Sequence, residues 1–368
     1  MQQGDAPRDS GVLEGLRERH KLVCVAAGKS TDKKESYAVA GTLQQGSDRK
    51  LEVNHKWPLL SMTKAMTATL IALLVKDGLL SWDSTLGDLL SDIPQLHPSH
   101  HDLTVKMITA QRTGLVGTWG ETFQSLLKAS RNPDLTPVEA RFRRTVDVLS
   151  LPSGNVRGTF TYNNSNYIIL GCIIDRITRS SWEEAIHERL FMPLGMNDTS
   201  IWPATATEVP TVGHFPSVLP FLNPTRFWPS LQQRVQLEAA GAPAGGACCT
   251  MQECNKFLRL HADGARGKPG LGLTKEDFAF LHTPYSTEKE KDEFERYTFG
   301  GWVRPYDMDH GEDDYCVWHP GGWLWYSTQG HIDVRSGNVY MAFTDMGWPG
   351  AVKALHDIVD TMREGELL

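Results

Sequence analysis

Hydrophobic and polar residues follow different spacings in different parts of the chain. Residues 10–20 have the spacing of a short amphipathic helix, and strand-like runs follow at 21–28 and 36–44. The almost wholly apolar run at 65–75 then predicts a buried helix, and Gly78 is placed to end it in a left-handed cap. The first quarter of the chain therefore predicts helix, two strands and a buried helix.

The middle of the chain has mainly helical patterns. A short helix is expected over residues 103–115, ending at Gly114, and a charged helical region over about 119–151. The strongly apolar stretch at 166–196 predicts two successive helices, and residues 250–264 predict another.

The last part of the chain returns to strand patterns. The sequence Ser-Gly-Asn at 336–338 is typical of a hairpin turn, and an amphipathic helix is expected at 351–365. Four short β-rich segments lie close together before that helix, and their spacing predicts antiparallel pairing: 296–305, 314–322, 323–337 and 338–345.

Strands near both chain ends with helices between them predict an α+β fold. We expect one antiparallel sheet, built from both chain ends and flanked by helices, with a mainly helical subdomain and a cleft between the two. The prediction is a single domain over 1–368, with an α/β part at about 10–75 and 240–368 and a helical part at about 76–240.

The composition narrows the classes of function. The 368 residues carry a formal charge of −7 and no run of Lys or Arg, which argues against nucleic-acid binding. The N-terminus has no secretion signal, and the longest apolar run is too short to span a bilayer, so we expect a cytoplasmic protein with no membrane partner. Six scattered cysteines match no zinc spacing, and we expect them reduced, mostly buried and without a cofactor.

Ser61 and Lys64 stand at the head of the predicted buried helix. At a spacing of three residues they share a helix face, where free backbone N–H groups favour negative charge. Burial disfavours the charged form of lysine, so Lys64 can become a proton acceptor that activates Ser61 as a nucleophile. A serine that caps the helix and a lysine that reaches water would give the same pattern.

Two further stretches carry candidate chemistry. Tyr162 and Asn164 lie in Tyr-Asn-Asn before a predicted helix, where a phenol suits proton transfer and an amide suits binding of a lysine or a substrate. A turn with a packed tyrosine is the alternative. In His-Pro-Gly-Gly, His319 would offer a donor and the glycines, Gly321 and Gly322, would let a substrate approach the backbone. A bulge rich in packing tryptophans is the alternative here.

Together, in this order and at this separation, the three motifs resemble the serine β-lactamase and penicillin-recognising family. The motifs are Ser-x-x-Lys, Tyr-x-Asn about a hundred residues later, and His-x-Gly near the C-terminal strands. Blocks such as "YNNSNYIILGCIIDRIT", "ERLFMPLGMNDTS" and "HPGG" extend the resemblance over roughly residues 10 to 362, with the nearest likeness to class C-related serine hydrolases and family VIII-type esterases.

The resemblance implies a role for each motif residue. Ser61 would be the nucleophile, Lys64 its base partner, and Tyr162 the general base for acylation and for activating water or an alcohol. Asn164 would position Lys64 and the substrate. The third motif would be filled by His319 and Gly321, and the backbone N–H groups of Ser61 and Gly322 would form an oxyanion hole.

One departure from the family pattern bears on the substrate. Many β-lactamases have Lys-Thr-Gly in the third motif, whereas this chain has His319-Pro320-Gly321. The fixed charge that binds a β-lactam carboxylate is therefore missing, which argues against strong β-lactamase activity and favours the esterase and acyltransferase relatives.

Three functions remain open at this point. The first is a metal-independent serine hydrolase that acts through an acyl-enzyme on an ester or amide of a small molecule. The second is an acyltransferase of small-molecule biosynthesis, and the third is a non-catalytic binding or assembly module of the same fold. The sequence does not set the oligomeric state.

Residues outside the motifs have plainer interpretations. His97, His100 and His101 could bind a metal, but they fall in a polar loop where no carboxylate has the spacing to complete the site. We interpret Arg112 and Thr113 as structural. Six aromatic residues are candidates for lining the cleft, with some expected in the core: Trp119, Trp202, Phe227, Trp228, Trp323 and Trp325.

Overall fold

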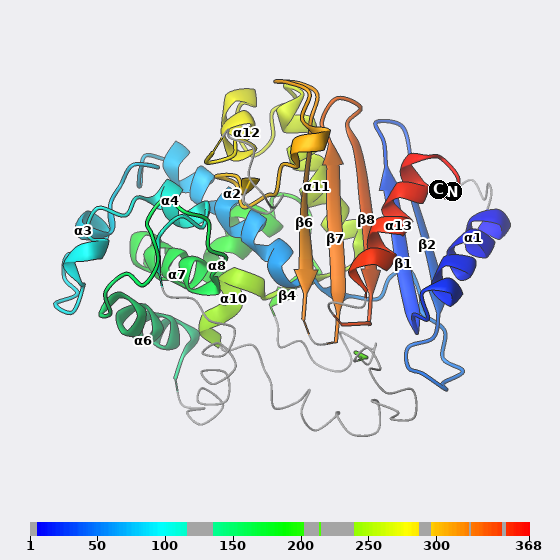
Figure 1. Ribbon diagram of the computed structural model, residues 1–368, viewed down its shortest axis with the longest axis horizontal. Coiled ribbons are helices and arrows are strands. Elements are labelled where there is room, and N and C mark those ends of the chain that lie inside the picture. The colour runs from blue at the N-terminus through cyan, green and yellow to red at the C-terminus, as the bar shows by residue number, and fades with distance from the viewer. Residues whose placement is uncertain are drawn as a thin grey trace.

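A five-stranded antiparallel sheet, in the order β2-β1-β8-β7-β6, is the centre of the protein (Figure 1). The computed structural model describes residues 6–115, 135–201, 213–214, 239–286, 296–323, 325–347 and 351–368. The strands are β1 (Cys24–Ser30), β2 (Glu35–Gly41), β6 (Cys316–Gly322), β7 (Ser327–Asp333) and β8 (Asn338–Thr344). Because β1 pairs directly with β8, the two chain ends form one sheet, which confirms the α+β prediction.

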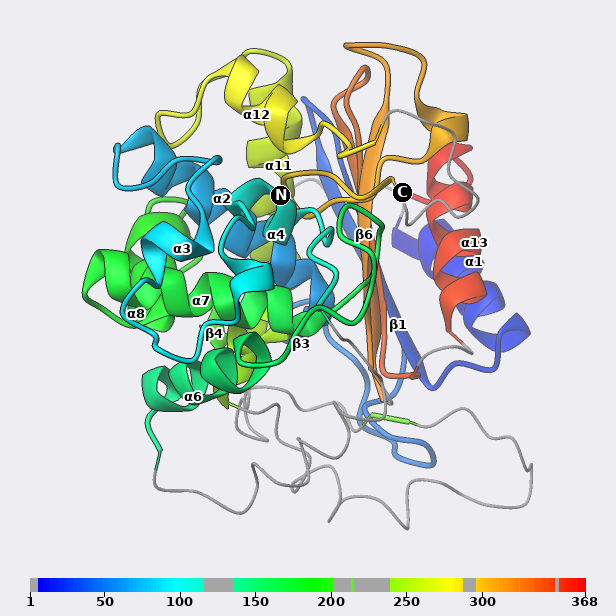
Figure 2. The same cartoon turned by 60° about the vertical axis from the view of Figure 1, so that its left-hand side comes forward.

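Helices α1 (Ala6–Arg19) and α13 (Val352–Arg363) cover one face of this sheet (Figure 2). Leu16 of α1 and Leu355 of α13 pack with Val25 of β1 in a separate apolar cluster. The predicted terminal helices are therefore present, and their apolar faces are buried because the sheet lies beneath them.

The other face of the sheet packs against α11 (Met251–Ala265), beside which runs α2 (Thr63–Lys76). All residues from Thr63 to Leu74 are buried, which explains why this helix is apolar on every side. Gly78 follows with φ +72°, as the predicted left-handed cap requires.

The region beyond α2 is mainly helical (Figure 1). The stretch 166–196 contains two successive helices as predicted, although the first of them begins two residues earlier, at Asn164; Arg179 ends it by adopting a left-handed conformation. A small second sheet has the order β3-β5-β4 and is made by β3 (Trp57–Pro58), β4 (Ser200–Ile201) and β5 (Ala247–Cys249). The remaining helices are α3 (Leu86–Leu89), α4 (Val105–Thr109), α6 (Pro137–Leu149), α7 (Asn164–Thr178), α8 (Trp182–Ile186), α10 (Ala242–Gly245) and α12 (Lys275–Leu281).

Two predicted elements are wrong in extent. The helix expected over 103–115 ends at Thr109, because Gln111 takes a left-handed backbone conformation with φ +62°. The β-rich segment 296–305 makes isolated bridges instead of a strand, since a turn at Gly301, with φ +73°, reverses the chain.

All six cysteines are free and buried, as expected of thiols that pack in the interior. No helix in the described ranges is long and apolar enough to cross a bilayer. Part of the predicted helical region, 119–134, lies outside the described residues.

Candidate active site

Ser61 lies in a short 3₁₀ turn, Leu60–Met62, directly before α2. Leu60 has φ +52°, a left-handed conformation that costs a non-glycine residue about 1 kcal/mol or more. Two hydrogen bonds to Ala247 of β5 hold the turn. The N–H of Leu59 donates to the carbonyl of Ala247 at 2.8 Å, and the N–H of Ala247 donates to Thr63 Oγ1 at 3.0 Å. The rigid turn leaves Ser61 partly exposed on a strained backbone.

Lys64 is fully buried beside Ser61. Its Nζ atom lies 3.1 Å from Ser61 Oγ and donates to the carbonyl of Ala244 at 2.7 Å. The Nζ atom also lies 4.8 Å from the ring centroid of Tyr162 and 5.6 Å from the ring centroid of Tyr167. Burial lowers the pKa of Lys64 well below its usual value, and no carboxylate within the described residues offsets this effect. A neutral Lys64 can donate one N–H to Ala244 and accept the proton of Ser61.

Tyr162 lies in the loop before α7 and is half-buried. Burial raises the pKa of its phenol, and a side-chain hydrogen bond with Ser61 works in the opposite direction. The resting phenol is therefore protonated. Gln111 fixes this loop on both sides of the tyrosine: its carbonyl accepts the N–H of Thr161 at 3.1 Å, and its Oε1 accepts the N–H of Asn163 at 3.0 Å. The left-handed backbone of Gln111 thus brings Tyr162 to Ser61.

Asn164 is the first residue of α7, next to the N-cap Asn163. Within the described residues, Asn164 does not make the expected hydrogen bond to Lys64. The amine of Lys64 donates to the carbonyl of Ala244 instead. The Oδ1 atom of Asn164 is buried and has no hydrogen-bond partner in the described part of the chain. Its predicted contact with a substrate stays a prediction.

The glycines of the third motif lie against the Ser61 turn. A Cβ atom at Gly321 would overlap the carbonyl oxygen of Leu59 and the hydroxyl of Thr328, which itself donates to that carbonyl at 3.1 Å. Gly322 ends β6 opposite Ser327, and Trp323 follows it, partly buried against the main core. Only glycine permits this approach of β6 to Ser61.

His319 is 1% exposed, and both of its ring nitrogens already have partners. Nδ1 lies 2.6 Å from the carbonyl of Pro320, and Nε2 lies 2.8 Å from the hydroxyl of Tyr297. Burial, and then the charge of Lys64, lowers the pKa of His319 to about 3. The expectation of a free donor from His319 is therefore not matched by this geometry, because no ring N–H remains for a substrate.

The remaining candidates are the histidine loop, Arg112 and Thr113, and the six aromatic residues. In the loop of His97, His100 and His101, each ring bonds a neighbouring serine or backbone carbonyl, and no group of three metal-binding side chains occurs in the described ranges. Thr113 donates to Asn166 at 2.8 Å, as expected of a structural residue. Of the six aromatic candidates, Trp325 is buried in the core, Trp323 is partly buried, and the other four lie outside the described residues.

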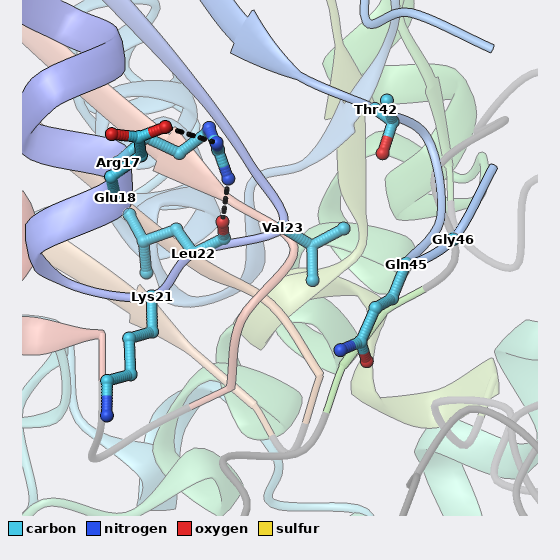
Figure 3. A pocket seen from close by; sticks show the side chains of 8 residues that line it. All are labelled: Arg17, Glu18, Lys21, Leu22, Val23, Thr42, Gln45 and Gly46. Atoms are coloured by element: carbon cyan, nitrogen blue, oxygen red, sulfur yellow. Dashed lines mark hydrogen bonds and ion pairs between the residues drawn. The ribbon is translucent and has the colours of Figure 1, made fainter. Parts of the chain in front are cut away.

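A cavity of about 390 Å³ lies elsewhere, at the end of α1 (Figure 3). Its lining includes Arg17, Lys21, Thr42 and Gln45. The guanidinium of Arg17 is already bound, since it donates to the carbonyl of Leu22 at 2.8 Å. None of the motif residues lines this cavity, so it is separate from the candidate active site.

Four residues that shape the site lie outside the sequence motifs. Leu60 and Gln111 contribute backbone conformations, Ala244 contributes a carbonyl, and Tyr297 contributes a hydroxyl. Only Ala244 carried a local signal, the following Gly245-Gly246 pair, which is typical of close backbone approach.

Ser61, the buried Lys64 and Tyr162 lie in contact between the antiparallel sheet and the helical region, and the fold is that of β-lactamases and transpeptidases. The family model described as Beta-lactamase matches residues 10–355, and the chain belongs to this family. The resemblance seen in the sequence is thereby confirmed.

Relatives and solved structures agree with this assignment. Penicillin-binding protein 4 of Amycolatopsis lactamdurans is 24% identical over 73% of this chain and 67% of its own length. Lovastatin esterase of Penicillium rubens is 25% identical over 64% of this chain and 56% of its own length. This chain therefore spans about two thirds or less of these curated relatives. The D-amino acid amidase of Ochrobactrum anthropi has the same fold, with a TM-score of 0.73 at 18% identity over 96% of this chain and 97% of its own.

Proposed function

We propose that this protein is a metal-independent serine hydrolase that acts through an acyl-enzyme on an ester or amide of a small molecule. The observation that carries the proposal is the 3.1 Å contact between Ser61 Oγ and the Nζ atom of the fully buried Lys64. An amine that burial keeps neutral is a base within reach of the serine proton.

The proton path follows from the two shifted pKa values. Lys64, with its lowered pKa, takes the proton of Ser61 as Oγ attacks the carbonyl carbon. Tyr162, with its raised pKa, holds a proton that it gives to the leaving oxygen or nitrogen. Lys64 then returns its proton to the phenolate, and water enters by the reverse steps. This proposal makes Lys64 the first base, whereas the family resemblance had implied Tyr162.

The tetrahedral intermediate needs donors for its oxyanion. We assign these to the backbone N–H groups of Ser61 and Gly322, which come from the turn and from the end of β6. The close approach of Gly321 to Leu59 supports the assignment, because it brings these two backbones together. The buried Oδ1 atom of Asn164 is a candidate acceptor for a substrate amide.

The relatives support hydrolysis of esters or amides without fixing the substrate. Their names include a lovastatin esterase, a D-amino acid amidase and a hydrolase of unguisins. The neutral third motif, with His319 in place of lysine, favours an esterase-like substrate over a β-lactam.

Intact-mass measurement after exposure to acyl esters, thioesters, D-amino amides and β-lactams tests the proposal. We expect an acyl adduct on Ser61 with at least one ester or amide, turnover of p-nitrophenyl esters, and labelling by a fluorophosphonate. The Ser61→Ala variant should show none of these. Absence of both adduct and turnover in the wild type would favour a non-catalytic module, and capture of the acyl group by added alcohols or amines in preference to water would favour an acyltransferase.

A further inference from the structure

The tautomer of His319 follows from its two hydrogen bonds. The carbonyl of Pro320 can only accept, so Nδ1, at 2.6 Å from it, carries the ring proton. In a neutral imidazole Nε2 is then an acceptor, and the hydroxyl of Tyr297, at 2.8 Å, must donate to it. His319 is therefore held as the neutral Nδ1–H form by Tyr297.

The surroundings of this pair disfavour a charge on His319. Tyr297 is fully buried, and its ring contacts the rings of Tyr162 and His319 edge to face, with centroids 6.2 and 5.6 Å apart. A protonated Lys64 of α2 would oppose protonation of His319 still further, because the two cations would repel each other. No carboxylate acts on the imidazole within the described ranges.

The nearby arginines do not replace the missing charge. Arg296 and Arg304 come from the same segment as Tyr297, and both are paired with Asp309, at 2.7 and 2.6 Å. Lys64 has its own task at Ser61. The third motif therefore presents a neutral imidazole in place of the lysine charge, and both arginines of the Tyr297 segment are engaged with Asp309.

We propose that Tyr297 is a positioning residue that keeps His319 neutral, so that the site selects acyl groups without negative charge near the reacting carbonyl. This inference rests on the proposed function and adds the substrate class. Tyr297 acts through His319 and does not touch the reacting atoms.

The experiment compares two p-nitrophenyl esters between pH 4.5 and 8. One carries a hexanoyl group and the other the same chain with a terminal sulfonate, whose charge is constant over this range. The ratio of their kcat/KM values cancels changes in Lys64 that affect both esters alike. For the wild type we expect a ratio of at least tenfold in favour of hexanoate, independent of pH.

The Tyr297→Phe variant removes the hydroxyl that stabilises neutral His319. We expect its ratio to fall at least threefold between pH 7 and 4.5, as the imidazole gains a proton and attracts the sulfonate. Tyr315→Phe is the matched control, because the Tyr315 hydroxyl also bonds a buried histidine, His282, at 3.0 Å. It should keep the wild-type ratio. An unchanged ratio in Tyr297→Phe, or a wild-type ratio that falls near pH 6.5, would overturn the proposal.

A second measurement separates this inference from the proposed function. Imidazole ¹H–¹⁵N correlation spectra, with the His319 signal assigned by its loss in His319→Gln, report the tautomer directly. We expect a neutral Nδ1–H form that does not titrate above pH 4.5, and a raised pKa in Tyr297→Phe. An Nε2–H form, or wild-type titration near pH 6.5, would refute the role of Tyr297, whereas a wild type inactive on every ester would refute only the hydrolase.

Discussion

The α-carbon of Gly321 lies so close to the carbonyl oxygen of Leu59 that a Cβ atom would overlap it. This contact joins the third motif, on β6, to the turn that carries Ser61. Two segments more than 250 residues apart thereby become one site, and the contact depends on a missing side chain.

Gly321→Ala should therefore damage both stability and activity. We expect a loss of about 1–3 kcal/mol in the free energy of unfolding, since both neighbours of the new methyl group are held by hydrogen bonds. Gly245→Ala is the control, because its Cβ would lie 3.5 Å from Leu60, an ordinary contact. Urea unfolding and ester turnover measure both effects. Equal stability of the two variants would contradict the packing described here.

Lys64→Met should abolish the base while keeping the packing. We expect kcat/KM to fall by about 10²- to 10⁴-fold, the usual contribution of a general base. The folded state should be as stable or more stable, because an apolar side chain replaces a buried amine. Lys76→Met, at the exposed end of the same helix, should change neither property. Retention of activity by Lys64→Met would rule out the proposed proton path.

The lowered pKa of Lys64 also predicts how stability depends on pH. In the unfolded chain lysine titrates at about 10.4, so between the folded pKa and that value the unfolded state binds more protons. The wild type should therefore gain stability relative to Lys64→Met as the pH rises through this window, by up to about 1.4 kcal/mol per pH unit. Urea unfolding at pH 7, 8 and 9 measures the difference. A constant difference would mean that Lys64 stays protonated in the folded protein.

Tyr162→Phe should separate attack by Ser61 from protonation of the leaving group. We expect ester turnover to fall by about 10²- to 10⁴-fold. Labelling by a fluorophosphonate should slow much less, because fluoride leaves without a proton from Tyr162. Tyr306→Phe, at an exposed tyrosine, is the control. Equal losses in labelling and turnover would instead indicate that Tyr162 acts on Ser61 itself.

The elements that local pattern predicted well are those whose burial is regular. The apolar run after Ser61 is a helix buried on all sides. The strand pattern near the C-terminus correctly predicts that β7 and β8 pair across the turn at Gly337. By contrast, the predicted helix before Gln111 is too long. Hydrogen bonds to the loop of Tyr162 fix the left-handed backbone of Gln111, and no local sequence pattern contains those distant bonds.

The resemblance of the three motifs to a known family implied that Ser61, Lys64 and Tyr162 would lie together, and in the structure they are in contact. It did not predict the partners that set their protonation. The carbonyl of Ala244 lies 180 residues from Lys64 in the chain, and Tyr297 lies 22 residues from His319. Such partners are chosen by packing, which depends on the whole fold.

The sequence alone determined the α+β class and the sheet made from both chain ends, because hydrophobic period is a local property of the chain, and the order of its motifs predicts which residues carry the chemistry. Tertiary structure decided which groups are charged and which are free to bind. Lys64 is deprived of water and of a carboxylate, and His319 is closed off by Tyr297 and Pro320. These states arise from desolvation and from contacts between distant segments, so they exist only once the chain has folded.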